Sequence, residues 1–233
     1  MLPHLNQIKR AALDFLFPQR CLGCGKEGVL LCDDCQKSLV RIVTLVCPKC
    51  GKPQPSGLLC PSCLNWKSSL DGIRSPFKFE GLVRETIHQF KYNNLRSLAH
   101  PLAALLRDFW LLNPLPGTLL IPVPLHPKRL RERGYNQSAL LAEELGKMIR
   151  MPVVKDILIR VKHILPQVQT HSAEERRTNV AQAFQCRSAL VKDSQVILVD
   201  DVATSGATLD ACAAALKLAG VTSVWGLVLA REI

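Results

Sequence analysis

Four C-x2-C pairs in the first third of the chain constrain this sequence more than any other feature. Each pair places two sulfur atoms around one tight turn, and Gly25 and Gly51 follow two of the pairs, where the turn needs a permissive backbone. Two such turns supply four thiolates, the ligand set of a tetrahedral structural zinc ion. Chain order favours two sites, Cys21, Cys24, Cys32 and Cys35 on one ion and Cys47, Cys50, Cys60 and Cys63 on the other. A crossed pairing through the gap between the two groups is the alternative.

A disulfide framework is the competing interpretation of the same cysteines. It requires an oxidising compartment. The N-terminus carries Lys9 and Arg10 and then a short apolar stretch that Asp14 interrupts, without a small-residue cleavage site. It does not have the pattern of a secretory signal, so we expect a cytoplasmic protein with zinc. Four sulfur ligands leave no open position, so the zinc is expected to be structural and the segment to depend on it for folding.

Composition narrows the function classes further. Of 233 residues, 48% are hydrophobic and 21% are charged, which is typical of a soluble globular protein. No apolar run approaches the roughly 18 residues of a membrane span, so we expect no membrane insertion. Two zinc ions on eight thiolates would lower the formal net charge of +11 to about +7. Such a charge permits nucleic-acid binding without demanding it, because aromatic residues for base stacking are few before residue 70.

Apolar periodicity after residue 70 predicts alternating strands and helices. The strands are expected at 73–79, 119–123, 153–159, 196–199 and 221–229, and the helices at 82–90, 95–112, 138–149 and 209–216. This alternation predicts an α/β fold, a parallel sheet with helices on both faces. We expect an N-terminal helical segment at 1–20, a double zinc ribbon at 21–66 and the α/β domain at 71–233. The polar stretch 160–179 is predicted to be a functional loop, and Cys186 and Cys212 to be small packed residues.

A buried strand that ends in two acids is the most specific feature of this domain. Asp200 and Asp201 follow the apolar run Val196–Val199, and a turn of small residues then leads into a helix. The amides of residues 204–208 at the start of that helix predict a phosphate site, to which Thr204, Ser205 and Thr208 add hydroxyl donors. The acids suit hydroxyl groups beside the phosphate, as on a ribose. An Asp-rich turn that only caps a helix is the alternative.

These residues carry a resemblance to known families. Residues 196–209 resemble the 5-phosphoribosyl-1-pyrophosphate (PRPP) signature of type I phosphoribosyltransferases, and nearly the whole chain resembles the ComF (competence protein F) family. The second resemblance rests on the cysteine ribbons and several short motifs. The motifs are 89–92 (QFKY), 121–124 (IPVP), 133–137 (RGYNQ), 166–167 (PQ), 175–176 (ER), 179 (N) and 183–184 (AF). It implies a type I phosphoribosyltransferase-like domain behind a double zinc ribbon. No Walker A or G-x-G-x-x-G pattern points to another nucleotide fold.

The resemblance also implies roles for individual residues. PRPP is expected to bind at Asp200, Asp201, Ala203, Thr204, Ser205, Gly206, Ala207 and Thr208. Pyrophosphate is expected at Val123, Pro124, Lys128, Arg129, Arg133 and Gln167, where cations would stabilise the leaving group. The loop at 160–179, with Lys162, Arg176 and Asn179, would close over the ligand and exclude water. Asp200, Asp201 and Arg176 are expected to be catalytic, with Mg²⁺ accompanying PRPP.

The implied reaction is attack of a nitrogen nucleophile on C1 of PRPP with loss of pyrophosphate, in a protein associated with DNA uptake and use. The acceptor is not identified, because segments such as 71–115 would select it. Two alternatives come from other classes: a PRPP or nucleotide sensor without turnover, and a single-stranded-DNA-binding factor that acts through the ribbons. Fold alone does not decide among them. Expected partners are PRPP or a phosphoribosyl nucleotide, together with single-stranded DNA or proteins of the competence machinery.

Overall fold

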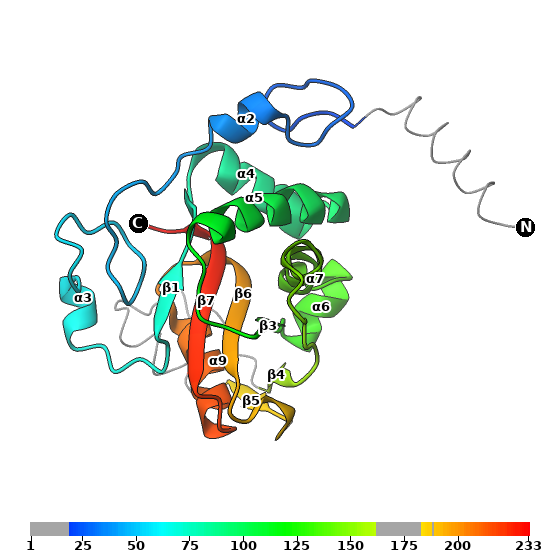
Figure 1. Ribbon diagram of the computed structural model, residues 1–233. Coiled ribbons are helices and arrows are strands. Elements are labelled where there is room, and N and C mark those ends of the chain that lie inside the picture. The colour runs from blue at the N-terminus through cyan, green and yellow to red at the C-terminus, as the bar shows by residue number, and fades with distance from the viewer. Residues whose placement is uncertain (1–18, 162–182, 188) are drawn as a thin grey trace, which may run out of the picture.

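A parallel sheet forms the centre of the structure, a computed structural model that describes residues 19–161, 183–187 and 189–233 (Figure 1). The strand order is β1 (Gly72–Arg74), β7 (Ser223–Arg231), β6 (Gln195–Ala203) and β3 (Leu119–Pro122). The short β2 (Phe77–Lys78) pairs with β7 beyond β1. All these pairings are parallel, which confirms the predicted fold class.

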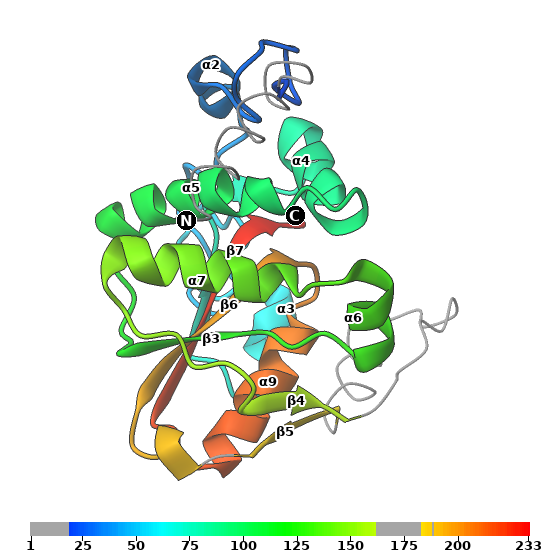
Figure 2. The ribbon, with the colours of Figure 1, turned by 90° about the vertical axis from the view of Figure 1, so that its right-hand side faces the viewer.

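Helices cover both faces of this sheet, and this explains why its central strands are apolar along nearly their whole length. The helices α5 (Ala99–Leu112) and α7 (Gln137–Ile149) pack on one face, and α9 (Ala207–Leu218) packs on the other (Figure 2). Residues therefore alternate between two cores along β6: Ile197 and Val199 point to α5 and α7, and Val196 and Leu198 point to α9.

Two further helices lie where the strands end. The helix α4 (Gly81–Tyr92) follows β2, and α6 (Pro127–Arg133) follows β3. The single turns η1 (Arg96–Leu98) and η2 (Ala189–Val191) precede α5 and β6, respectively. Carboxyl ends of parallel strands are the usual ligand side of such sheets, so α4 and α6 are placed to shape a site.

One predicted strand is wrong, and another is interrupted. Within the run 153–159, Val153 forms a bridge to Leu120, and regular strand structure begins only at the end of the run, with β4 (Leu158–Arg160). It pairs antiparallel with β5 (Phe184–Cys186), outside the main sheet. Asp156 has a φ of 65°, a left-handed conformation that breaks an extended run. The strand predicted at 73–79 is split at Pro76, which has no N–H to donate.

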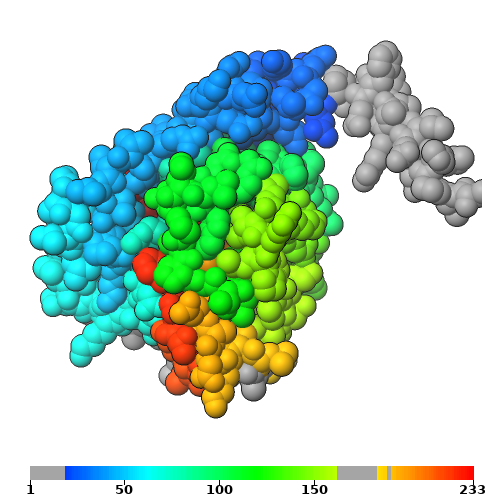
Figure 3. All heavy atoms as spheres, in the orientation of Figure 1, coloured from blue at the N-terminus to red at the C-terminus, as the bar shows by residue number. Residues whose placement is uncertain are grey.

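The cysteine-rich segment packs along two sides of the sheet domain, where Figure 3 shows it from blue to cyan. Each half contains two cysteine turns, and the second turn of each runs into a short helix, α2 (Asp33–Lys37) or α3 (Pro61–Leu64). Gly25 and Gly51 have φ angles of 76° and 72°, as their turns require. No helix in the described part of the chain has the length and apolar character to cross a membrane.

Candidate functional site

The cysteines gather into two groups of four, in the order of the chain. Within each group all four sulfur atoms lie within 4.8 Å of one another; the groups are Cys21, Cys24, Cys32 and Cys35 (tetrad 1) and Cys47, Cys50, Cys60 and Cys63 (tetrad 2). This arrangement is the sequential pairing, so the crossed pairing is excluded. Residues 1–18, which include most of the predicted N-terminal helical segment, lie outside the described part.

The sulfur geometry fits a zinc ion. Tetrahedral Zn–S bonds of about 2.3 Å place neighbouring sulfurs about 3.8 Å apart. The Cys24–Cys32 and Cys50–Cys60 sulfur separations are 3.6 and 3.7 Å. Burial alone would raise the pKa of Cys21, but backbone N–H groups around its sulfur, that of Cys32 first, lower it to about 6. The hydrogen bond to Cys21, together with burial, raises the pKa of Cys35 to about 12, so four neighbouring thiolates require a cation between them.

The two acids at the carboxyl end of β6 occupy different environments. Asp201 is 3% exposed, whereas Asp200 is half-buried. The Asp200 carboxylate accepts hydrogen bonds from the Ser138 hydroxyl at 2.7 Å and from the backbone N–H of Asp201 at 2.9 Å. Burial and the neighbouring charge of Asp201 raise the pKa of Asp200 to about 7. The pair therefore holds acceptor oxygens under mutual repulsion, which hydroxyl donors would relieve.

Asp201 has a cationic partner that the sequence did not reveal. The ammonium Nζ of Lys91, at the end of α4, lies 2.6 Å from Asp201 Oδ1. The other carboxylate oxygen, Oδ2, is buried without a hydrogen-bond partner among the described residues. Lys91 belongs to the motif at 89–92, which the sequence analysis linked to the family but to no role. The contact joins α4 to the end of β6, so only the tertiary fold reveals it.

The predicted phosphate turn has the expected strand–turn–helix form. Chain segment β6 ends at Ala203, and α9 begins at Ala207 after Gly206, which has a φ of 80°. Thr204 is exposed, and Ser205 and Thr208 are half-buried. The side chain of Ser205 accepts from the N–H of Ala207 at 3.3 Å. The amides at the start of a 12-residue helix make this turn, residues 203–208 (the phosphate turn), suited to an anion.

The motif at 133–137 lies between two parts of the site. It connects the end of β3, where pyrophosphate is expected, to the acids at the end of β6. Gly134 ends α6 with a φ of 76°. Asn136 caps α7, and its amide donates to the Val123 carbonyl at 3.0 Å. Ser138, the second residue of the same helix, donates its hydroxyl to Asp200. Since Val123 also pairs with Val199 of β6 at 3.0 Å, the ends of β3 and β6 are fixed beside each other.

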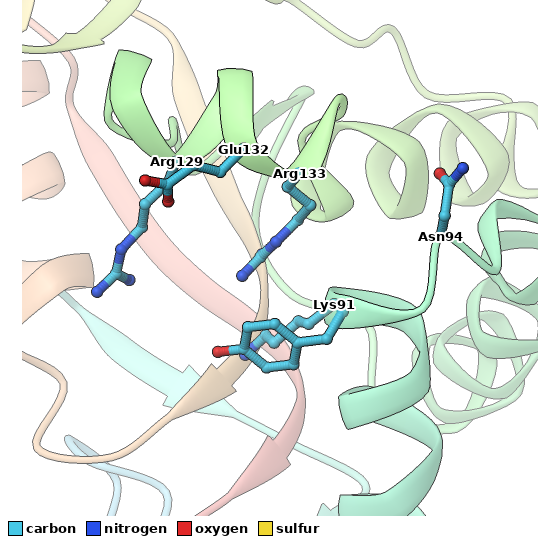
Figure 4. A pocket seen from close by; sticks show the side chains of 6 residues that line it. Lys91, Asn94, Arg129, Glu132 and Arg133 are labelled. Atoms are coloured by element: carbon cyan, nitrogen blue, oxygen red, sulfur yellow. The ribbon is translucent and has the colours of Figure 1, made fainter.

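A basic pocket of about 480 Å³ opens between α4 and α6 (Figure 4). Its lining residues are Lys91, Tyr92, Asn94, Arg129, Glu132 and Arg133. Figure 4 shows Arg129 and Arg133 reaching from α6 towards the side of the pocket where Lys91 lies. The Arg133 guanidinium lies 5.2 Å from the Tyr92 ring centre and donates to Gln137 Oε1 at 2.5 Å. Two of the predicted pyrophosphate residues therefore line the same pocket as Lys91, the partner of Asp201, while Lys128 is exposed on the same helix.

Arg160 is a second cation that sequence reasoning missed. It ends β4, its guanidinium lies 5.4 Å from the Phe184 ring centre, and its Nε is buried without a hydrogen-bond partner among the described residues. Burial and the nearby charge of Arg129 lower the pKa of Arg160, and Asp200 acts in the opposite direction. Four residues expected to act from the loop lie outside the described residues: Lys162, Gln167, Arg176 and Asn179.

Comparison with known families agrees with this architecture. Residues 12–64 match the double zinc ribbon domain, and residues 134–232 match the phosphoribosyl transferase domain. Among solved structures, the glutamine phosphoribosylpyrophosphate amidotransferase from B. subtilis, complexed with ADP and GMP, is similar with a TM-score of 0.40. That similarity has 19% identity and covers 57% of this chain and 26% of the other.

Curated relatives match over most of their length. Competence protein F of Haemophilus influenzae is 34% identical, over 91% of this chain and 97% of its own. Competence protein ComFC of Bacillus subtilis is 30% identical, over 88% and 86% of the two chains. DNA utilization protein YhgH of Salmonella typhi is 30% identical, over 87% and 91%. With its double zinc ribbon and phosphoribosyltransferase domain, the chain therefore belongs to the family of competence protein F, ComFC and YhgH.

Proposed function

We propose that this protein binds PRPP with Mg²⁺ and transfers its phosphoribosyl group to a nitrogen nucleophile, with pyrophosphate as the leaving group. The observation that carries the proposal is the position of Asp200 and Asp201 between an anion-ready turn and a basic pocket. The acids would accept hydrogen bonds from the ribose hydroxyls. The phosphate turn would bind the 5-phosphate through its amides and through the hydroxyls of Thr204, Ser205 and Thr208.

The pyrophosphate would occupy the pocket between α4 and α6. Arg129 and Arg133 line it together with Lys91, and Val123 and Pro124 precede α6 along the chain. Three cations lining one pocket would stabilise the charge that develops on the leaving group. Arg160, with its unsatisfied Nε beside Arg129 and Asp200, would add a fourth. We keep Lys128, Gln167 and Arg176 as proposed contacts of the same group.

Magnesium fits this site because the site offers carboxylate oxygens, which are hard ligands, and because a buried oxygen of Asp201 has no partner among the described residues. When bound, Mg²⁺ would neutralise negative charge on the pyrophosphate leaving group. The chain's own residues orient the sugar and hold the leaving group. No covalent nucleophile is needed, since positioning and charge account for departure of pyrophosphate. Residues 160–179 would exclude water when the ligand is bound.

The domain boundaries we propose are an N-terminal helical segment at 1–20, the double zinc ribbon at 21–66 and the phosphoribosyltransferase-like domain at 71–233. We also propose that the protein is cytoplasmic. The names of the relatives refer to competence and to DNA utilization, which supports a role connected with DNA uptake or use. DNA binding through the ribbons receives little support, because Trp66 is the only aromatic residue described before residue 70 and is 7% exposed. Stacking on single strands needs accessible rings.

Turnover is tested by following pyrophosphate release from PRPP and Mg²⁺ by the zinc-loaded protein, with ammonia, primary amines, nucleobases and single-stranded oligonucleotides as acceptors. We expect release that depends on one acceptor and is lost in the Asp200→Asn/Asp201→Asn variant. Lys147→Met is the control, because the Lys147 ammonium is exposed and forms its salt bridge with Glu144 of the same helix, outside the proposed site. PRPP binding without release from any acceptor class would replace the transferase with a PRPP sensor. Absence of both would overturn the proposal.

A further inference from the structure

A buried arginine joins tetrad 2 to the phosphate turn. Arg231, at the end of β7, is 1% exposed. Its Nε donates to the carbonyl of Cys50, a member of tetrad 2, at 2.9 Å. Its Nη1 donates to the carbonyl of Ala203 at 2.6 Å and also to the carbonyl of Thr204. One guanidinium therefore spans the cysteine turn and the first two residues of the phosphate turn.

The orientation of those two carbonyls determines where the turn presents its donors. In a trans peptide unit the C=O and the following N–H point in opposite directions. When the carbonyls of Ala203 and Thr204 face Arg231, the N–H groups of Thr204 and Ser205 face away from it. They are then available to a phosphate on the open side. Arg231 thus fixes two of the donors that an anion would meet.

The buried charge of Arg231 needs a compensating negative charge nearby. Among the described residues no carboxylate forms a salt bridge with it. A zinc ion on four thiolates carries a net charge of −2. A loaded tetrad 2 therefore supplies the counter-charge that a buried guanidinium requires.

Other contacts anchor the same end of the ribbon segment to α9. The indole Nε1 of Trp66 donates to Asp210 at 3.1 Å, and the hydroxyl of Ser68 donates to the same carboxylate at 2.8 Å. The ring of Trp66 packs against Gly206, where a Cβ would lie 3.1 Å from it. Tetrad 1 packs elsewhere: Gly23, beside Cys35, abuts Leu82 of α4.

We propose that Arg231 is a positioning residue that couples zinc in tetrad 2 to the shape of the phosphate turn. The inference rests on the proposed PRPP site. Zinc in tetrad 2 holds the Cys50 carbonyl and balances the guanidinium; the guanidinium in turn holds the turn ready for phosphate. Coupling between binding sites is reciprocal, so PRPP should also tighten zinc in tetrad 2. Among the described residues, tetrad 1 has no such connection to the turn.

The first test compares Arg231→Lys with Arg74→Lys. Arg74 also donates to a carbonyl of the second ribbon, that of Pro48 at 2.9 Å, but has no contact with the phosphate turn in the described structure. A lysine keeps the charge and loses the fork that reaches several carbonyls. We expect Arg231→Lys to speed amide hydrogen exchange at 203–208 and to weaken PRPP binding about tenfold or more. Chelator competition should remove one of its zinc ions more readily, and Arg74→Lys should match the wild type.

The second test leaves Arg231 in place and removes one ligand from either tetrad. Cys24→Ser alters tetrad 1 and Cys60→Ser alters tetrad 2; each is the most exposed member of its group. We expect faster exchange at 203–208 only in Cys60→Ser. Equal effects of the two substitutions, or no effect of Cys60→Ser and Arg231→Lys, would overturn the coupling. If the wild type does not bind PRPP, the proposed function fails, while exchange and zinc retention still decide the coupling.

Discussion

Single side chains at the end of β6 meet opposing demands of binding and stability. Asp200 and Asp201 lie beside each other in a poorly solvated site, where repulsion raises the pKa of Asp200 to about 7. Lys91 compensates Asp201, at 2.6 Å, and Ser138 donates to Asp200. Such strained acids are a common property of ligand sites. Two predictions follow from these contacts.

Replacing Asp200 should stabilise the folded chain at neutral pH. The carboxyl binds its proton more tightly in the folded chain, with a pKa of about 7, than at its ordinary value of 3.8. Its contribution to stability is therefore lost as pH rises through the folded-state pKa. We expect Asp200→Asn to raise Tm above that of the wild type at about pH 8, by about 2–4 °C per kcal/mol. The gain should shrink as pH falls towards 4; a lower Tm at pH 8 would contradict this account.

Removing Lys91 should expose the cost of the buried Asp201 charge. We expect Lys91→Met to lower the free energy of unfolding by roughly 1–3 kcal/mol. The double variant Lys91→Met/Asp201→Asn should lose less than the sum of the single losses, because the two substitutions remove one interaction. Urea unfolding of the four proteins measures the coupling. Additive losses would show that the ion pair contributes nothing.

Among the elements, α6 has some basic side chains that line the pocket and others that do not. It follows β3 at the ligand side of the sheet, and all its residues except Arg133 are exposed. Arg129 and Arg133 line the pocket, whereas Arg131 does not belong to its lining. Because the helix has one apolar residue, Leu130, its sequence reads as an ordinary solvated basic segment. Its position beside α4 is what assigns part of it to the site.

The different positions of Arg129 and Arg131 on α6 predict different effects of two similar substitutions. Arg129→Met should weaken PRPP binding about tenfold, more strongly at low salt, since it removes a cation from the lining of the proposed pyrophosphate pocket. Arg131→Met changes net charge equally and should leave the affinity within about twofold. Calorimetric titrations at two salt concentrations provide the comparison. Equal losses in both variants would indicate attraction by net charge rather than a built site.

At the scale of the whole molecule, the ribbons are part of the domain's packing rather than an appendage. Cys47, Cys50 and Cys63 lie in the same apolar core as Ile73 and α9. Cys21 and Cys35 lie in the core that includes α4 and α5. Zinc therefore contributes to the stability of both faces of the protein.

Thiol reactivity should report this arrangement. In the zinc-loaded protein we expect the eight tetrad cysteines to resist a thiol reagent, because metal-bound and buried thiolates are inaccessible. Cys212 is fully buried, and burial together with the charge of Asp200 raises its pKa well above the ordinary value, so it should also resist. Only Cys186, which is half-buried, should react. A chelator should then release two zinc ions per chain and make the tetrads reactive; rapid reaction of the tetrads before chelation would contradict the zinc assignment.

Much of this architecture follows from local patterns in the sequence. The apolar run before Asp200 and the small residues after it predict β6, the phosphate turn and α9, and the cysteine spacing predicts both tetrads. The sequence pattern does not reveal the left-handed conformation of Asp156, so the strand predicted at 153–159 begins too early. Lys91 and Arg231 could not be assigned because their roles arise from contacts between distant segments. The sequence around Arg231 does not distinguish it from a solvent-exposed arginine, and only the fold shows that it is buried.

Calorimetric titration of the zinc-loaded protein with PRPP and Mg²⁺, beside Asp200→Asn/Asp201→Asn, tests the central claim most directly. The account predicts micromolar binding by the wild type and its loss in the variant, with two zinc ions retained in both proteins. Equal binding by the two proteins would show that Asp200 and Asp201 do not contribute to PRPP binding. No binding by a folded, zinc-loaded wild type would contradict the phosphoribosyl site itself.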